Sequence, residues 1–239
     1  MSKESIPYEL LKLLNEEEIM MFQELRIKIQ ELNYKTNLTR LIEGDDYWIS
    51  QVYDSLWIFK ENSNEIFDNK RFIDVGSGCG FPGFAYAITH PNSEIYLVDS
   101  SKKKTDALKN IIKSMNFKNK IFAINDRIEN LGRQSSFKNS FNIATARAVS
   151  NPSTVTEYIL PMLQSNGLGI LYCGKWTNED NKNLEKTLKV LEGKIAEIKS
   201  NFLPREKGIR NAIFIEPKAS CPDIYPRSVG KAEKYPLKG

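Results

Sequence analysis

Apolar residues recur with helical spacing in the first part of the chain. One face of a helix predicted within residues 6–32 carries Ile19, Phe22, Leu25, Ile29 and Leu32. Asn15 followed by Glu18 matches a capping box, in which each side chain bonds to the other residue's backbone N–H. A second helix is predicted over residues 47–59, and the polar stretch 62–69 is predicted to be a linker. The chain therefore begins with a helical extension.

Short apolar runs alternate with helical patterns from about residue 70 onward. Strands are predicted at residues 72–75, 95–98, 121–124, 141–144 and 169–173. Helices are predicted between them at residues 83–89, 102–115, 153–163 and 181–193. The apolar stretches 195–202 and 211–216 have no helix between them, so they are expected to pair as an antiparallel hairpin. The pattern predicts an α/β fold, with a doubly wound, mostly parallel sheet of about seven strands.

The pattern divides the chain into three segments. We expect an N-terminal helical extension over 1–69, a cofactor-binding domain over 70–217 and a C-terminal tail over 218–239. The chain has 239 residues, of which 41% are hydrophobic, enough for one sizeable core and a small appendage. Lys and Arg total 34 against 30 Asp and Glu, and the excess lies in residues 203–239. A basic tail is compatible with phosphate contacts, and equally with a solvated surface.

Cysteine usage and hydropathy limit the class of protein. Cys79, Cys173 and Cys221 are far apart and lack the spacing of metal ligands, which is typical of a reduced, cytoplasmic protein without a structural metal. No apolar run approaches the roughly 18 residues of a membrane-spanning helix. We expect a cytoplasmic monomer that does not associate with membranes.

A glycine-rich turn follows the first predicted strand. Residues 72–83 read Phe-Ile-Asp-Val-Gly-Ser-Gly-Cys-Gly-Phe-Pro-Gly, and Asp99 closes the next strand, 23 positions after Gly76. Glycines let the backbone turn sharply and approach a ligand, and a carboxylate at the end of the second strand can accept both ribose hydroxyls. The pairing predicts a site for an adenosine-containing cofactor.

The residue after the third glycine discriminates between cofactors. A dinucleotide fingerprint needs glycine or alanine where this chain has Phe81. The bulky side chain, followed by Pro82, suits a cofactor without a diphosphate, such as S-adenosylmethionine. A nicotinamide oxidoreductase is therefore disfavoured.

Four motifs in order carry a family resemblance. They are Ile-Asp-Val-Gly-Ser-Gly-Cys-Gly-Phe-Pro-Gly at 73–83, Leu-Val-Asp-Ser at 97–100, Asp-Arg-Ile-Glu at 126–129 and Thr-Ala-Arg-Ala-Val at 145–149. The chain resembles the bacterial 16S ribosomal RNA guanine-N7 methyltransferases, the glucose-inhibited division protein B family, from about residue 15 to its end. The resemblance implies a class I S-adenosylmethionine-dependent methyltransferase fold. It also implies a guanine in the decoding-region loop of 16S ribosomal RNA, presented in the small subunit, as substrate.

The resemblance also implies a donor site. Its residues would be Gly76, Gly78, Phe81, Asp99, Ser100, Ser101, Ile128, Glu129 and Arg147. Asp99 has an alternative reading as the cap of the helix that opens at Lys102, and Glu129 as a solvated loop residue. Arg147 would contact either the donor's carboxylate or an RNA phosphate. The family usually has histidine where this chain has Gln51, so a role for that histidine is in doubt here.

The expected chemistry needs few acid or base groups. The single histidine, His90, lies in a Thr-His-Pro turn, and no Cys, Ser and His arrangement indicates covalent catalysis. Guanine N7 carries a free lone pair and can attack a methyl group directly, so we expect catalysis by positioning, with no general base. Asn37 is a candidate contact for guanine O6, although an asparagine in a turn that ends a helix explains it equally well.

Two rival functions fit parts of the pattern. A methyltransferase for another RNA or a small metabolite would use the same glycine turn and Asp99. A ribosome assembly factor could keep the fold and bind RNA without chemistry.

The basic residues expected to contact ribosomal RNA are Arg205, Lys207, Arg210, Arg227, Lys231 and Lys234.

Overall fold

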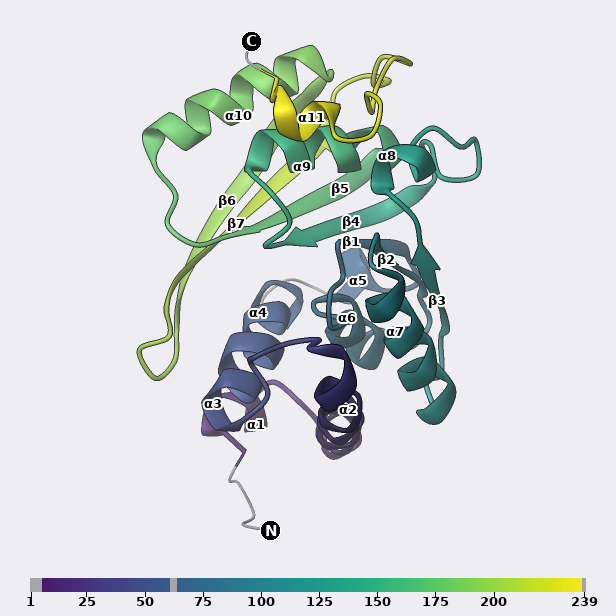
Figure 1. The fold of residues 1–239 in the computed structure, drawn as a ribbon. Coiled ribbons are helices and arrows are strands. Elements are labelled where there is room, and N and C mark those ends of the chain that lie inside the picture. The colour runs from purple at the N-terminus through teal and green to yellow at the C-terminus, as the bar shows by residue number, and fades with distance from the viewer. Residues whose placement is uncertain (1–5, 61–63, 238–239) are drawn as a thin grey trace.

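A seven-stranded sheet forms the centre of the computed structural model, which describes residues 6–60 and 64–237 (Figure 1). The strand order is β3-β2-β1-β4-β5-β7-β6. The strands are β1 (Arg71–Val75), β2 (Glu94–Asp99), β3 (Lys120–Asn125), β4 (Phe141–Arg147), β5 (Leu163–Cys173), β6 (Gly193–Leu203) and β7 (Gly208–Pro217). The first five pair in parallel, whereas β7 is antiparallel to both β5 and β6. The predicted fold is confirmed.

Helices cover both faces of the sheet (Figure 1). One face carries α2 (Glu16–Thr36), α4 (Asp54–Lys60), α6 (Gly83–Thr89) and α7 (Lys102–Ser114). The other carries α8 (Ile128–Leu131), α9 (Pro152–Ile159), α10 (Asn178–Val190) and α11 (Lys231–Lys234). Each face has its own buried apolar cluster. Phe22 and Trp57 of the extension share a cluster with Phe72 and Phe84, so the extension packs into the core beside the sheet.

The N-terminal extension differs from the prediction in detail. Two helices replace the single one expected over 6–32, because the chain ends α1 (Tyr8–Leu11) and restarts at the Asn15 cap. The Asn15 side chain accepts from the Glu18 N–H at 2.9 Å, and the Glu18 carboxylate accepts from the Asn15 N–H at 2.9 Å. The predicted capping box is therefore confirmed, although it marks the start of a second helix.

The predicted helix over 47–59 is also divided. α3 (Gly44–Tyr47) passes into a π-helical segment, η1 (Trp48–Tyr53), before α4 begins. The predicted linker contains a short helix, α5 (Asn64–Phe67), while its first two positions lie outside the described residues. The spacing of apolar residues indicates that this region is buried. It does not indicate that the hydrogen bonding changes from α-helical to π-helical within the helix.

The second half of the sheet departs from the prediction at β5. This strand begins at Leu163, six residues earlier than expected, with an irregularity in its pairing to β4 between Phe141 and Ile143. Residues 164–166 are polar, so a prediction based on runs of apolar residues does not include this part of the strand. A 3₁₀ turn, η2 (Leu160–Met162), links α9 to the strand.

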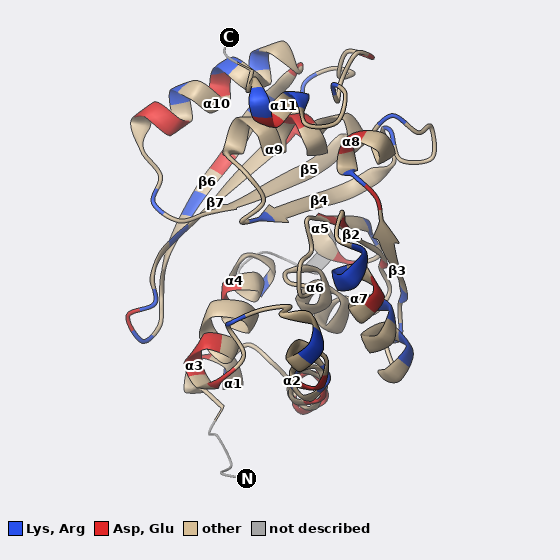
Figure 2. Cartoon of the chain, viewed as in Figure 1, with Lys and Arg blue, Asp and Glu red and all other residues tan. Residues whose placement is uncertain are grey.

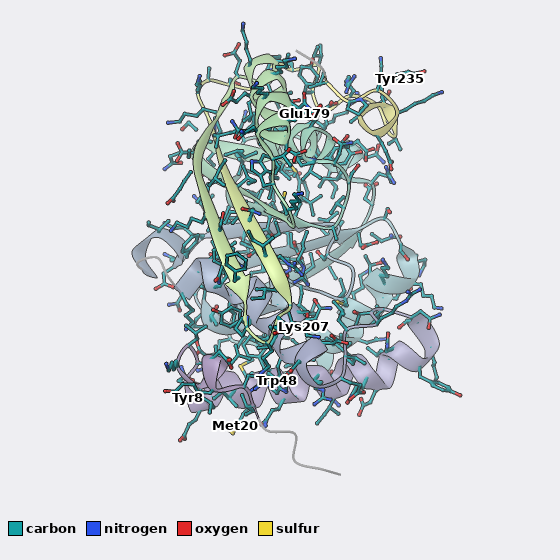
Figure 3. All side chains as sticks on the ribbon, turned by 90° about the vertical axis from the view of Figure 1, so that its left-hand side faces the viewer. Tyr8, Met20, Trp48, Glu179, Lys207 and Tyr235 are labelled. Atoms are coloured by element: carbon teal, nitrogen blue, oxygen red, sulfur yellow. The ribbon has the colours of Figure 1, made fainter. Side chains whose placement is uncertain are left out.

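The β6–β7 hairpin extends beyond the sheet to the helical extension (Figure 3). Near its tip, Arg205 pairs with Asp45 at 2.6 Å and Lys207 pairs with Asp46 at 2.7 Å. These two cations were predicted to contact RNA, and the structure gives each an internal carboxylate partner. No helix among the described residues is long and apolar enough to cross a membrane.

Candidate cofactor site

A cavity of about 280 Å³ lies at the carboxyl ends of the first four strands. It is lined by Gly76 after β1, Asp99 and Ser100 at the end of β2, Asp126 and Ile128 after β3, and Val149 after β4. Ligands of open α/β sheets bind at this edge, where the strand order reverses direction between β1 and β4. The cavity is therefore the first candidate for a cofactor site.

The glycine turn reaches this cavity at Gly76. Gly76, Gly78 and Gly80 have φ values of 70°, 56° and 97°, a region that residues with a Cβ rarely adopt. A Cβ on Gly76 would lie 2.5 Å from a methyl of Val149, which itself lines the cavity. The turn thus brings bare backbone to the cavity edge, which a ligand can approach closely.

Asp99 holds the turn to the end of the second strand. Its carboxylate accepts a hydrogen bond from the Gly78 N–H at 3.0 Å and another from the Ser101 N–H at 2.8 Å. The residue is 8% exposed and borders the cavity. Ser101 caps α7, so the alternative reading of Asp99 as that cap is wrong. A carboxylate fixed in this way has lone pairs left for ribose hydroxyls.

A second carboxylate, Asp74 at the end of β1, anchors the other end of the turn. It accepts from the Gly83 N–H at 3.2 Å and from the Thr145 hydroxyl at 2.9 Å, and it is 1% exposed. Burial raises its pKa from 3.8 to about 6, even though both hydrogen bonds act in the opposite direction. Ionised Asp74 therefore costs stability at neutral pH.

The structure brings four of the predicted donor-site residues to the cavity. Gly76, Asp99, Ser100 and Ile128 line it. Gly78 and Ser101 lie behind these residues as the partners of Asp99. Phe81 is 3% exposed and packs edge-on against Tyr47 of the extension, with 6.0 Å between ring centroids. Its bulk fills the interface between the turn and the extension.

Glu129 is buried, so its alternative reading as a solvated loop residue is wrong. It is 1% exposed, pairs with Arg127 at 3.0 Å and accepts from the Gly230 N–H at 2.9 Å. Burial opposes its ionisation, but the bonds from Arg127 and Gly230 outweigh that cost and lower its pKa. Glu129 thus connects the loop after β3 to the C-terminal tail.

Arg147 points from the end of β4 into the helical extension. Its guanidinium pairs with Asp54 at 3.2 Å and donates to the Ser50 carbonyl at 3.3 Å. It also donates to the side chain of Gln51, which in turn donates to Thr39 at 3.1 Å and to the Cys79 sulfur at 3.3 Å. Gln51, which stands where the resemblance led us to expect histidine, thus joins the extension, the glycine turn and β4.

Asn37 lies where α2 ends. It is an exposed residue in the left-handed conformation, with φ 49°, and its N–H donates to the Asn33 carbonyl at 2.9 Å. The neighbouring Asn33 side chain bonds to the backbone of Thr39 on both its N–H and its carbonyl. The helix end is therefore rigidly shaped, and Thr39 reaches the glycine turn through Gln51.

Comparison with known proteins decides the family. Residues 18–207 match the family described as GidB, rRNA small subunit methyltransferase G. A curated protein named Ribosomal RNA small subunit methyltransferase G, from Prochlorococcus marinus subsp. pastoris, is 88% identical over 239 residues and the full length of both chains. This chain belongs to the GidB family. Its cofactor, as predicted, is S-adenosylmethionine.

Solved structures that resemble this GidB-family chain agree on the fold. A putative RNA methyltransferase from Pyrococcus horikoshii has a TM-score of 0.53 at 14% identity, covering 84% of this chain and all of that one. A mutant of MtNAS in complex with S-adenosylmethionine has a TM-score of 0.54 at 12% identity, covering 90% of this chain and 79% of that one. At such low identity the likeness concerns the fold alone.

Several cavity residues of this family member were not predicted from the sequence. Asp126 directly follows β3, and its position at a strand end was a usable signal. Lys104 lies in the run Lys102-Lys103-Lys104 at the start of α7, and such a run does not indicate which lysine lines a cavity. Tyr158 and Glu233 reach the cavity from α9 and α11, and no local pattern announces such a long-range contact. No group of three or more His, Cys, Asp or Glu placed to hold a metal occurs among the described residues.

Replacing Gly76 with alanine should weaken binding of the cofactor. The new Cβ would clash with Val149 and would sit at a φ of 70°. We expect S-adenosylhomocysteine to bind at least tenfold more weakly to Gly76→Ala in calorimetric titrations. Gly174→Ala is the matched control, because a Cβ there meets nothing within 4 Å. Equal affinities of the two variants would contradict this geometry.

Replacing Asp74 with asparagine should change how stability depends on pH. The raised pKa means that the folded state binds more protons than the unfolded state between pH 3.8 and about 6, so Asp74 costs more stability as pH rises through this window. The rise corresponds to about 3 kcal/mol. Urea unfolding should show Asp74→Asn gaining stability over the wild type from pH 4 to pH 7. A difference that does not vary with pH would contradict the raised pKa.

Proposed function

We propose that this protein transfers the methyl group of S-adenosylmethionine to N7 of a guanine in 16S ribosomal RNA, within the small subunit. The supporting observation is the cavity at the strand ends, where the glycine turn and Asp99 meet. Family membership supports ribosomal RNA of the small subunit as the substrate. The choice of N7 comes from the family resemblance, and the small number of acid and base groups is compatible with it.

The residues fit the donor because Gly76 brings bare backbone, and Asp99 a carboxylate, to the lining of the cavity. S-adenosylmethionine would supply an activated methyl group on a sulfonium centre. Asp99 would accept from the ribose hydroxyls, since both of its oxygens are fixed by backbone N–H groups. Asp126 and Ile128 would lie on the side of the base, because β3 is the next strand outward from β2.

No side chain needs to remove a proton in this reaction. Guanine N7 is an unprotonated acceptor, so the site has to align it and exclude water. His90 is 2% exposed and stacks on Tyr86, and burial lowers its pKa to about 4. It is therefore neutral at physiological pH and built into the core. Catalysis by positioning suits this set of residues.

Arg147 would act by holding the helical extension and, through Gln51, the glycine turn in place beside the site. Its ion pair with Asp54 and its bond to Gln51 occupy the guanidinium in the extension. This arrangement keeps its positive charge away from the cation that develops on the guanine ring, where it would be repulsive. Of the two partners first considered, neither the donor's carboxylate nor an RNA phosphate is needed to explain its position.

The acceptor guanine would enter beside the loop that follows α2. Asn37 is exposed there, and it would donate to guanine O6 through its side-chain amide. Tyr34 is 93% exposed on the last turn of the same helix, available to stack on a base. The contact of Thr39 with Gln51 ties this loop to the glycine turn, so base and donor sites would be held together.

Basic residues near the cavity would contact the RNA backbone. Lys102, Lys103 and Lys104 open α7, and this start is marked by positive charge beside the end of β2 (Figure 2). Lys102 pairs with Asp106 at 2.6 Å on the exposed surface, a pair that a phosphate can replace at little cost. The ion-paired side chains of Arg205, Lys207, Arg210 and Arg227 are less exposed than that of Lys102, so they are weaker candidates.

Transfer of labelled methyl tests the proposal. Purified protein should transfer label from S-adenosylmethionine to small ribosomal subunits that lack this modification, and mapping should place it on one guanine N7 of 16S RNA. Already methylated subunits are the control and should take up no label. Label on free small molecules or another RNA would contradict the substrate. No label despite demonstrable donor binding would favour an assembly factor without chemistry.

A further inference from the structure

The C-terminal tail lies against the cavity and contributes to its lining. Its short helix α11 packs on α9, on the face of the sheet that also carries α8 and α10 (Figure 1). Glu233 of this helix lines the cavity together with Asp126 and Arg127. The basic tail expected from the sequence thus presents a carboxylate to the candidate donor site.

A buried ion pair fixes the start of this segment. The guanidinium of Arg227 donates to both carboxylate oxygens of Glu157, at distances of 2.6 to 3.0 Å, and Glu157 is fully buried in α9. The same guanidinium donates to the Tyr235 carbonyl at 2.8 Å, beyond the far end of α11. Because Glu157 would otherwise be an uncompensated buried charge, this pair keeps the segment in place.

Two further contacts fix the middle of the segment beside the cavity. Gly230 donates its N–H to Glu129 at 2.9 Å, and the Thr154 hydroxyl donates to the Ala232 carbonyl at 3.1 Å. Ala232 is fully buried, whereas Glu233 next to it is exposed. The buried neighbour orients the helix, so Glu233 stands at the cavity on a rigid support.

The position of Glu233 in the cavity indicates what it can bind. It shares the cavity with Asp126, which follows β3, on the far side of β2 from the glycine turn. If Asp99 binds the ribose, the adenine base lies on the β3 side of the cavity. A carboxylate has only acceptor atoms, and the hydrogen-bond donor on an adenine base is its amino group.

We propose that Glu233 accepts a hydrogen bond from the amino group of the donor's adenine, and that residues 227–235 form a fixed wall of the cofactor site. The inference rests on the proposed function only in assigning the cavity to S-adenosylmethionine. It gives the tail a role in donor binding that is independent of RNA.

Calorimetric titration with S-adenosylhomocysteine, in the absence of RNA, tests the wall. Glu233→Ala should bind about tenfold more weakly than the wild type. Glu179→Ala is the matched control, because it removes the same charge from an exposed position of α10 that does not line the cavity, and it should bind within twofold of the wild type. Because both side chains are exposed, thermal unfolding should be unchanged in both. Unchanged affinity of Glu233→Ala, with loss of RNA binding in Lys234→Ala, would overturn the inference in favour of an RNA-binding tail.

A base analogue tests the assigned hydrogen bond. S-inosylhomocysteine has a carbonyl in place of the adenine amino group, so it has nothing to donate to Glu233 at that atom. The affinity difference between wild type and Glu233→Ala should therefore disappear with this ligand. An equal loss with both ligands would overturn the contact to the amino group.

Asp99→Ala separates this inference from the proposed function. If the wild type fails to bind S-adenosylhomocysteine, or if Asp99→Ala binds it as well as the wild type, the assignment of the cavity is wrong and the inference falls with it. If Asp99→Ala weakens binding and Glu233→Ala does not, only the role of the tail is wrong.

Discussion

Two carboxylates at the ends of neighbouring strands hold the backbone turn on which the whole site depends. Asp74 binds the N–H of Gly83, where α6 begins, and Asp99 binds the N–H of Gly78 within the turn. Three glycines in the left-handed region have no conformational preference strong enough to keep this shape alone. The hydrogen bonds to the two carboxylates hold the turn in this shape. The arrangement requires a buried Asp74, whose ionised form is destabilised by burial.

The rest of the molecule braces this turn from two sides. On one side, Phe81 packs on Tyr47 and Gln51 bonds to Cys79, so the helical extension is in direct contact with the turn. On the other side, the loops after β3 and β4 line the cavity. The tail is held beside it by the bond from Gly230 to Glu129 and by the ion pair of Arg227 with Glu157. The cavity itself is lined by residues between Val75 and Tyr158 and by Glu233 of the tail, while the extension supports the turn without lining the cavity.

The sequence predicted those features that depend on local pattern. Alternating apolar runs located all seven strands, and the position of Asp99 at a strand end placed it at the cavity. The π-helical turn around Gln51 and the early start of β5 were not predictable, because burial and polar residues there do not follow a simple period. Arg147 and Glu129 were recognised by motif, but their partners lie 93 and 101 residues away. Periodicity carries no information about such pairings.

A crystal structure of the protein with S-adenosylhomocysteine is the most direct test of this cofactor site. We expect the ribose hydroxyls to lie within hydrogen-bond distance of Asp99, the base between the ends of β2 and β3, and its amino group beside Glu233. Binding elsewhere, or a ribose with no contact to Asp99, would contradict the claim that the carboxylate-held turn is the cofactor site.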